Sequence, residues 1–422
     1  MNEAPHRHDV LVVGGGPAGA AAAHWLARAG HDVVVLERKT FPREKTCGDG
    51  LTPRAVRQLQ LMGLEERIAA EHHRYDGLRA IAHGITLELQ WPDHPELPSY
   101  GYVVRRRDLD TLVARSAAEQ GATLLEGTEA VAPILRDGIV GGAIVKDKAS
   151  NETRELHARY VVVADGSLSR FGRALGTARN KRYPQGMAIR GYFESPLHDD
   201  PWIESALDVR DREGNSLPGY GWVFPVGDGT INVGIGLLST FRDFKSVNTT
   251  HLMHEWAATA PAHWAIDPDA MLGEPTGGRL PMAGSVDPKV GPSWIVIGDA
   301  AGSINPFNGE GIDYAYETAR MAADLLHEAL TTGSALALSR YPRMLDDEYG
   351  LYFRVARLFA KVIGQPVLMR ELTRVGMQSR SLMEWVLRIM ANLLRDDEIG
   401  PAEAAYAAVA NLVKLVPERV AV

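Results

Sequence analysis

The only cysteine of the 422-residue chain, Cys47, lies in the loop KTCGDGLTPRA, residues 45–55. Free cysteine usually packs as a small apolar residue, but here charged residues precede it and glycines follow it. Glycines allow the backbone to lie close to a bound molecule. We therefore interpret Cys47 as a candidate reactive thiol, the alternative being an inert buried side chain.

A phosphate-binding turn is predicted near the N-terminus, in the stretch DVLVVGGGPAGA that begins at residue 9. Gly14, Gly16 and Gly19 match the pattern GxGxxG, in which glycines permit a tight turn, close approach of a pyrophosphate and close packing of helix on strand. The phosphates are expected to rest on the start of the next helix, at Pro17 and Ala18. On its own, the pattern also suits a glycine-rich turn in any α/β protein.

An acidic residue at the end of the next predicted strand strengthens this assignment. Glu37 follows Gly19 by 18 residues, and Arg38 comes directly after it. A carboxylate at this distance accepts hydrogen bonds from the ribose hydroxyls of an adenine dinucleotide and disfavours the 2′-phosphate of NADP. The N-terminal segment therefore predicts an adenine dinucleotide site.

Two further motifs follow in the same chain, each directly after a short apolar strand. One is the DG of RYVVVADGSLSR, and the other is the GD of SWIVIGDAAGS, which leads through glycine-rich turns into a helix. A helix N-terminus carries partial positive charge and suits an electron-rich ligand edge. The residues concerned are Asp165, Gly166, Asp299, Gly309, Gly311 and Ile312.

With these motifs the chain resembles the flavoprotein superfamily of aromatic hydroxylases and geranylgeranyl reductases, which share GxGxxG, a central DG and a late GD. The resemblance implies FAD as the cofactor, with Asp299 accepting hydrogen bonds from the ribityl chain. It also implies that Arg106, the first residue of an RxxLD turn, lies near the FAD phosphates. Arg105 and Arg107 flank it and leave the register open, and a solvated basic turn is the alternative.

The segment 179–289 has the composition of an antiparallel sheet, with Trp, Pro and alternating apolar residues. In LPGYGWVFPVGDGTINVGIG, Tyr220 and Trp222 are two residues apart and share one face of an extended strand. Such a pair belongs either to the core or to the wall of a pocket. The stretch resembles the YxWxFP signature of geranylgeranyl reductases, whose aromatics face an isoprenoid beside the flavin, and more loosely the WxWxIP element of flavin halogenases.

The Cys47 loop resembles the CGxG loop of geranylgeranyl reductases, which passes over the isoalloxazine ring. The residues that this implies at the cofactor are Cys47, Gly48, Asp49 and Gly50, with Asp49 at the variable position. Those that it implies in catalysis are Cys47, Tyr220 and Trp222. Because the chain has no second cysteine, a redox switch within one chain is excluded.

The similarity is greatest to the actinobacterial menaquinone reductases, through CGDGLTPRAV, DDPW, LPGYGWVFP and NPFNGEGIDY. That subgroup saturates one isoprene unit of the menaquinone tail, which is the reaction that the resemblance implies. The alternatives are a reductase of geranylgeranyl lipids, an FAD-dependent aromatic monooxygenase or halogenase, and a non-catalytic flavin or lipid carrier.

The proton source stays open among Cys47, Asp49, Tyr220 and water. No second GxGxxG is present, so the electron donor is NAD(P)H docking transiently or another reduced carrier.

These residues require an α/β scaffold, α+β overall: a glutathione-reductase-type Rossmann FAD domain, as in aromatic hydroxylases, with an inserted antiparallel-sheet domain and a C-terminal helical segment. We expect residues 9–82, 104–178 and 290–345 in the FAD-binding domain and residues 83–103 and 179–289 in the sheet domain that binds substrate. Residues 346–422 are expected to form the helical domain.

Composition narrows the partners and the location. The formal charge of −8 argues against nucleic acid, and a single cysteine excludes a thiolate metal cluster, so we expect no metal. No apolar run has the length of a signal or membrane span, so a cytoplasmic protein is expected.

Residues 351–395 hold eight basic and two acidic residues in a helical pattern. This pattern suits either peripheral contact with anionic lipid on the inner face of the cell membrane or a helical cap with a solvated basic face.

Overall fold

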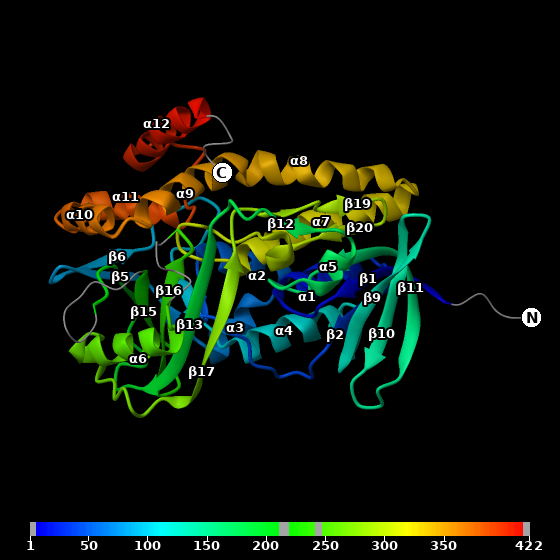
Figure 1. Ribbon diagram of the computed structural model, residues 1–422, viewed down its shortest axis with the longest axis horizontal. Coiled ribbons are helices and arrows are strands. Elements are labelled where there is room, and N and C mark those ends of the chain that lie inside the picture. The colour runs from blue at the N-terminus through cyan, green and yellow to red at the C-terminus, as the bar shows by residue number, and fades with distance from the viewer. Residues whose placement is uncertain (1–5, 211–218, 241–246, 417–422) are drawn as a thin grey trace, which may run out of the picture.

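A computed structural model describes residues 6–210, 219–240 and 247–416. Figure 1 shows two sheet-based halves side by side, with the helices of the C-terminal segment above them.

The first half is built on an eight-stranded sheet whose central strands are all parallel, as the strand–turn–helix pattern predicts. The central strands run in the order β20 (Trp294–Val296), β11 (Thr153–Val163), β1 (Arg7–Val13), β2 (Val33–Glu37) and β8 (Thr123–Glu126). The antiparallel additions are β19 (Val290–Gly291), β9 (Thr128–Arg136) and β10 (Ile139–Asp147).

Strand β1 is apolar along its length because both of its faces are covered. Val10 and Val12 pack in one core with three helices, α1 (Pro17–Arg28), α4 (Arg106–Glu119) and α7 (Ile312–Thr332), whereas Leu11 and Val13 pack in a second core on the opposite face. The alanine-rich α1 packs against both α4 and α7. This arrangement fixes the end of β1, where the first glycine turn begins.

The second half is a seven-stranded sheet. Its order is β17 (Leu272–Pro281), β13 (Gln185–Glu194), β16 (Thr230–Leu238), β15 (Tyr220–Pro225), β14 (Trp202–Ala206), β5 (Gly77–Ala82) and β6 (Ile85–Gln90). All neighbours pair antiparallel except β14 and β5. Because β5 belongs to this sheet, the N-terminal contribution to it starts at Gly77 rather than at the expected residue 83.

Residues of one strand of this sheet face opposite sides, as an extended backbone requires. Gly221 lies against the ring of Trp256 on helix α6 (Thr249–Thr259), which covers one face. The alternate residues Tyr220, Trp222 and Phe224 therefore face the other side, toward the first half.

Two small sheets connect the halves. The three-stranded sheet has the order β3 (Gly50–Leu51), β7 (Gly101–Val103) and β4 (His73–Tyr75), and β12 (Ala178–Arg179) pairs with β18 (Val286–Asp287). Since β3 starts at the last glycine of CGDG, its pairing with β7 fixes one end of the Cys47 loop.

The C-terminal segment is helical, as expected. Its helices are α8 (Tyr341–Leu345), α9 (Leu351–Ile363), α10 (Pro366–Gly376), α11 (Arg380–Met390) and α12 (Pro401–Leu415), and the shorter helices elsewhere are α2 (Pro53–Met62), α3 (Glu65–Glu71) and α5 (Arg170–Ala174). Figure 1 shows α10 and α11 above β5 and β6, and Met383 and Leu387 of α11 share a core with Leu89 of β6. No helix in the described part of the chain has the length and apolar character needed to cross a bilayer.

Candidate active site

One cavity of about 830 Å³ joins the predicted motifs, which is within the range of sites for sizeable ligands. It begins at the glycine turn after β1, passes the Cys47 loop and the aromatic face of β15, and ends below α10 and α11. Of the residues predicted at the site, those in its lining are Gly14, Gly16, Pro17, Ala18, Glu37, Arg38, Cys47, Gly48, Asp49, Gly50, Arg106, Asp165, Gly166, Tyr220, Trp222, Asp299, Gly309, Gly311 and Ile312.

The first turn has the geometry that GxGxxG requires. A Cβ at Gly19 would overlap the carbonyl oxygen of Gly14, so helix and strand meet too closely for any side chain. At Gly16 the nearest atom to a Cβ would be a guanidinium nitrogen of Arg43 at 3.7 Å, an ordinary van der Waals contact, and this glycine lines the cavity. No side chain of the described residues caps α1, which leaves its first amides available to phosphate.

Glu37 is buried at the end of β2, beside this turn. Its Oε2 accepts from Gly15 N at 3.3 Å and pairs with Nη2 of Arg43 at 3.2 Å, and its Oε1 accepts from Lys39 N at 3.0 Å. Arg43 also pairs through Nη1 with Oδ2 of Asp110 at 2.8 Å. The sequence analysis missed Arg43, whose only signal is its position in the charged loop after β2.

The RxxLD register is resolved by burial. Arg106 lies in the cavity wall and forms a bidentate pair with Asp110, at 2.7 and 2.9 Å. Arg105 points instead to Asp228, with Nη2 2.8 Å from its Oδ2, and Arg107 is exposed beside Asp108. The predicted residue, Arg106, is therefore the arginine of this turn that lines the cavity.

The DG and GD motifs meet on the same side of the cavity. The carboxylate of Asp165 accepts from the Ser169 hydroxyl at 2.6 Å and from Phe171 N at 2.9 Å, so it also holds the start of α5. Asp299 lies beside the start of α7, where a Cβ on Gly311 would be 3.4 Å from its Oδ1. Helix α7 begins at the cavity without a side-chain cap, and its first amides are thus available to a ligand.

The Cys47 loop packs directly on the aromatic strand. A Cβ at Gly48 would lie 3.1 Å from Cε2 of Phe224 and 3.4 Å from Nε1 of Trp222, and a Cβ at Gly50 would lie 3.1 Å from Cε2 of Phe224. The glycines of CGDG therefore permit contact with β15. The sequence analysis predicted both elements at one site, and the structure brings them together.

Asp49, which matches a variable position of the CGxG pattern, makes specific buried hydrogen bonds in this protein. It is fully buried with a left-handed backbone (φ 66°), and its Oδ2 accepts from the Tyr192 hydroxyl at 2.5 Å and from Nδ2 of Asn232 at 2.8 Å. Arg106 N is 3.3 Å from its Oδ1. The Asp49 carboxylate thus anchors the loop through three hydrogen bonds, and the residue also lines the cavity.

Electrostatics favour a neutral thiol at Cys47. Burial raises the pKa of the Cys47 thiol above its ordinary range, while the charge of Arg106 acts in the opposite direction. Burial also lowers the pKa of Lys45, two residues earlier in the cavity wall, although the nearby Asp299 carboxylate opposes that change. A protonated thiol is a poor nucleophile but still carries a hydrogen.

The aromatic residues of β15 are held by hydrogen bonds. Nε1 of Trp222 donates to Oδ1 of Asn232 at 2.9 Å, and the Tyr220 hydroxyl donates to the carbonyl oxygen of Asn308 at 2.5 Å. Their ring centroids are 6.1 Å apart, and the ring of Phe224 lies 6.3 Å from that of Trp222. Burial raises the pKa of Tyr220, so its hydroxyl stays protonated.

Beyond the aromatic strand the cavity lining is mainly apolar, although Ser205, Asp208, Arg370 and Thr373 also contribute to it. Its lining there comes from the second sheet and from the C-terminal helices, namely Leu78, Ala80, Leu89, Trp91, Ile203, Phe359, Ile363, Met369, Leu372, Met383, Val386, Leu387 and Met390. A chain-like hydrocarbon fits such a space better than a polar or ionic ligand.

The comparisons with known proteins agree with this geometry. The sequence matches the family described as FAD binding domain over residues 7–344. It is 40% identical to menaquinone reductase of Mycobacterium tuberculosis (strain H37Rv), over 97% of both chains, and 31% identical to digeranylgeranylglycerophospholipid reductase 2 of Methanopyrus kandleri, over 85% of this chain and 87% of that protein.

The chain belongs to the geranylgeranyl reductase family of FAD-dependent oxidoreductases. Among solved structures, a geranylgeranyl bacteriochlorophyll reductase-like protein from Thermoplasma acidophilum superposes with a TM-score of 0.75 at 22% identity, covering 97% of this chain and 99% of that one. That likeness confirms the predicted fold class.

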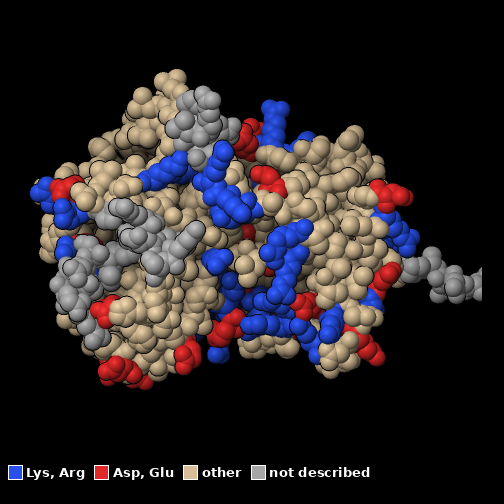
Figure 2. Space-filling model, viewed as in Figure 1, with Lys and Arg blue, Asp and Glu red and all other residues tan. Residues whose placement is uncertain are grey.

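FAD is therefore the cofactor of this geranylgeranyl reductase family member, and the residues present fit it. The glycine cradle at Gly16 is open, α1 and α7 start uncapped at the cavity, and Nε of Arg43 is buried without a hydrogen-bond partner among the described residues. The first half supplies to the cavity lining several basic side chains suited to a pyrophosphate, namely Arg38, Lys39, Arg43, Lys45, Arg106 and Arg170. Figure 2 shows Lys and Arg concentrated in the middle of one face, at the junction of the two halves.

The basic C-terminal pattern does not form one free charged face. Several of its arginines pair with nearby acids: Arg374 with Glu371 in α10, Arg380 with Glu384 in α11, Arg388 with Glu403 of α12, and Arg395 with Asp397 in the connection between α11 and α12. Arg357 is buried over the ring of Tyr183. The exposed face of α10 is instead partly apolar, with Val367 and Val375 68% and 57% exposed.

Proposed function

We propose that the protein is a reductase that saturates one C=C bond of a polyprenyl chain, most specifically one isoprene unit of menaquinone. The observation that carries this proposal is the continuity of one cavity, from the glycine cradle at Gly16, past the loop of Cys47, to the apolar space below α10 and α11. The names of the relatives, a menaquinone reductase and a digeranylgeranylglycerophospholipid reductase, support a prenyl substrate.

For FAD we assign the adenosine and pyrophosphate to the first half of the cavity. Gly14, Gly16 and the start of α1 would hold the pyrophosphate, and Glu37 the ribose. Asp299 and the start of α7, with Gly309, Gly311 and Ile312, would hold the ribityl chain and the flavin edge. When bound and reduced, FAD supplies an electron pair and one hydrogen to the alkene carbon beside it.

The chain's own residues then have to orient the alkene, exclude water and provide a proton. An isolated trisubstituted alkene has no carbonyl to accept negative charge, so the proton must arrive before or together with the electron pair. Positive charge develops at the tertiary carbon, and the ring faces of Tyr220 and Trp222 would stabilise it by about 0.5–2 kcal/mol per contact. That is too little alone, so most of the acceleration would come from holding the alkene in a dry cavity.

Cys47 is proposed to work as a protonated thiol. Its loop rests on Trp222 and Phe224 and is fixed by Asp49, so the position of the sulfur in the cavity wall is well defined. A neutral thiol there would orient the prenyl chain or pass on a hydrogen without competing as a nucleophile.

The apolar face of α10 is proposed to rest on a membrane. Met369 and Leu372 of α10 line the cavity, Leu372 while 44% exposed, and Val367 and Val375 are more exposed still. A lipid substrate would thus pass from the bilayer beneath this helix into the site.

The electron donor is proposed to be NAD(P)H or another reduced carrier that docks at the basic end of the cavity.

Mass spectrometry of lipids from a host that makes unsaturated menaquinone tests the proposal. Expression of the protein should yield menaquinone heavier by two hydrogens, and the Gly16→Ala variant, made in equal amount, should yield much less. Unchanged menaquinone, together with other prenyl lipids heavier by two hydrogens, would shift the assignment to a geranylgeranyl-lipid reductase. No change in any prenyl lipid would contradict it.

A further inference from the structure

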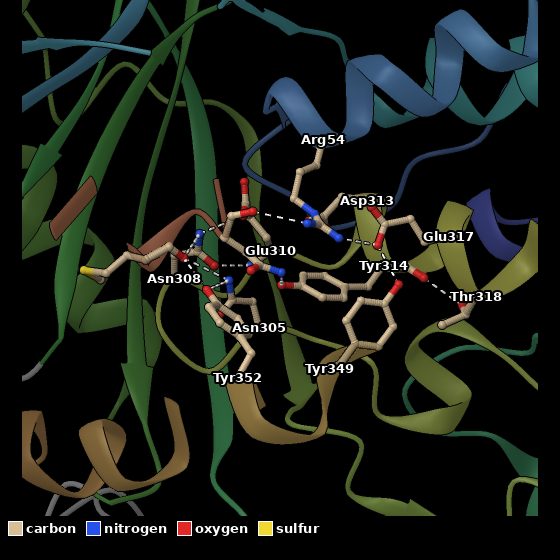
Figure 3. Close-up of polar contacts among 12 residues, drawn as sticks. Arg54, Asn305, Asn308, Glu310, Asp313, Tyr314, Glu317, Thr318, Tyr349 and Tyr352 are labelled. Carbon is tan, nitrogen blue, oxygen red and sulfur yellow. Dashed lines mark hydrogen bonds and ion pairs between the residues drawn. The ribbon is translucent and has the colours of Figure 1, made fainter. Parts of the chain in front are cut away.

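A group of buried and half-buried acidic residues lies in the first turns of α7 and just before them (Figure 3). Its members are Glu310, Asp313 and Glu317, and the cation among them is Arg54 of α2. Glu310 and Asp313 line the cavity described above.

Arg54 is committed to Glu317. Its Nη2 lies 2.6 Å from Oε2 of Glu317, which also accepts the hydroxyl of Tyr349 at 2.6 Å. The other end of Arg54 is 3.9 Å from Oδ2 of Asp313, and no hydrogen bond forms there. The Arg54 guanidinium thus neutralises the carboxylate of Glu317. The carboxyl groups of Asp313 and Glu310 have no such close cation among the described residues.

A buried carboxylate without a partner is costly, and two that are close together repel each other, so such groups hold protons. Asp313 is 1% exposed, and neither of its oxygens has a hydrogen-bond partner among the described residues. Oε1 of Glu310 is likewise buried without a hydrogen-bond partner among the described residues, while Oε2 of Glu310 accepts from Nδ2 of Asn308 at 2.8 Å.

Glu310 lies at the reacting end of the cavity. The carbonyl of Asn308, two residues before it, accepts the hydroxyl of Tyr220, and a Cβ on Gly309 would lie 3.5 Å from that same hydroxyl oxygen. Asn308 thus contacts Glu310 through its amide and Tyr220 through its carbonyl. The proton on Glu310 is thereby kept beside the aromatic wall against which the proposed substrate lies.

We propose that Glu310 is the proton donor for alkene reduction, with the Arg54–Glu317 pair and Asp313 keeping it protonated. This inference rests on the proposed function. In the balanced step, reduced FAD gives an electron pair and one hydrogen to one alkene carbon and Glu310 gives a proton to the other. The π bond breaks, two C–H bonds form, FAD is left oxidised, and the Glu310 carboxylate regains a proton from solvent.

The electrostatics suit such a cycle. Burial raises the pKa of Glu310 to about 7, with a smaller contribution from Glu317, while Thr52, Asn308 and Arg54 oppose the rise. The other titratable groups that face Glu310 are Asp313 of α7, Tyr75 of β4, Tyr220 of β15 and Tyr352 of α9. An acid with a pKa near neutrality both donates and recovers its proton readily. Burial and the nearby carboxylates raise the pKa of Asp313 well above its ordinary value, so Asp313 keeps its proton.

The test compares wild type, Glu310→Gln, Glu310→Asp and, as matched control, Glu348→Gln. Glu348 is an exposed acid whose pKa is also raised, chiefly by burial with a contribution from Glu317, but it does not line the cavity. Each FAD-loaded protein is reduced chemically without oxygen and mixed with menaquinone at pH 5.5–9. The wild-type rate should fall as the pH rises through about 7, because the proton-donating form of Glu310 is lost.

Glu310→Gln should react at least about 100-fold more slowly than wild type, because general acids contribute about 10²–10⁴-fold to a rate. The rate of this variant should not fall as the pH rises through neutrality. Glu310→Asp should keep a slower but still pH-dependent reaction, and Glu348→Gln should match wild type. A Glu310→Gln rate within threefold of wild type with the same pH profile would overturn the proposal. If Glu310→Gln does not fold, an unaltered pH profile and rate in Glu310→Asp would do so.

Infrared spectra give a readout that does not depend on turnover. The FAD-loaded wild type should lose a protonated-carboxyl C=O band between pH 6 and pH 8.5, and Glu310→Gln should lack this change while Glu348→Gln retains it. An identical difference spectrum in Glu310→Gln would contradict the assignment. If the wild-type protein left menaquinone unreduced, the proposed function would be wrong. The infrared spectra would still show whether Glu310 holds a proton at neutral pH.

Discussion

Asn232 donates from Nδ2 to the buried Oδ2 of Asp49 across 2.8 Å, and this bond ties the cysteine loop to the sheet that forms the opposite wall of the cavity. The same nitrogen lies 3.0 Å from the carbonyl oxygen of Cys47, and Oδ1 of Asn232 accepts from the Trp222 indole. One buried amide thus sets the distance between the thiol and the aromatic strand.

Replacing this amide should loosen the site. Asn232→Ala leaves Asp49 and the Trp222 N–H short of a partner, and an unsatisfied buried polar group costs about 1–3 kcal/mol. Urea unfolding of the FAD-loaded protein should show that loss, whereas Asn411→Ala on the exposed face of α12 should change stability by less than about 0.5 kcal/mol. Equal stability of the two variants would mean that the loop does not depend on Asn232.

The glycine cradle predicts a separation between folding and cofactor binding. At Gly16 the backbone is extended and a Cβ has 3.7 Å of room, so Gly16→Ala should fold normally without FAD. The added methyl group would occupy the space assigned to the pyrophosphate and weaken FAD binding at least about tenfold, or 1.4 kcal/mol. Fluorescence titration with FAD measures this, with Gly141→Ala in β10, which has open space, as the control. Wild-type affinity in Gly16→Ala would place the phosphates elsewhere.

Arg43 should matter more for stability than a surface arginine. It bridges Glu37 and Asp110, and all three side chains are largely buried. Removing one partner of a buried ion pair typically costs about 3–5 kcal/mol, so Arg43→Ala should be strongly destabilised in urea. Arg67→Ala, which breaks an exposed pair with Glu119, should lose at most about 1 kcal/mol. Similar losses in the two variants would show that the Arg43 bridge contributes little.

Cys47 should affect the reaction more than the cofactor. Cys47→Ser removes the sulfur with little change in shape, so FAD content, measured from the flavin absorbance, should stay stoichiometric. Alkene reduction under anaerobic conditions should slow by about tenfold, because the thiol would no longer help to orient the prenyl chain. Unchanged turnover in a variant with full FAD would remove the cysteine from the mechanism.

Membrane contact through α10 should depend on its apolar face. Liposomes of anionic lipid should carry the wild-type protein in a flotation assay at physiological salt. Val375→Asp, at an exposed site on α10, should reduce binding several-fold, whereas Val409→Asp, equally apolar and 48% exposed on α12, should not. If wild type does not float, or if both variants bind as wild type does, α10 is not the contact.

The local parts of this architecture could be predicted because neighbouring residues determine them. The unbroken apolar run of β1 and the spacing of Gly14, Gly16 and Gly19 specify a strand covered on both faces and a turn with no room for side chains. The shared face of Tyr220 and Trp222 follows from strand geometry alone.

The remainder depended on contacts between distant parts of the chain. Asp49 looks like a free polar residue of a glycine loop, but its partners Tyr192 and Asn232 are 143 and 183 residues away. Arg54 and Glu317 are 263 residues apart, so no local pattern reveals that Glu310 lies beside an already neutralised pair. For the same reason, no local pattern in residues 351–395 reveals that Glu403 of α12 pairs with Arg388.

The central claim is that reduced FAD meets a prenyl double bond in this cavity. The most direct test is a single-turnover reaction of purified, FAD-loaded protein, reduced chemically without oxygen and mixed with menaquinone. We expect the flavin absorbance of the oxidised state to return while one equivalent of menaquinone gains two hydrogens in its tail by mass spectrometry. Flavin that stays reduced beside menaquinone of unchanged mass would contradict the account.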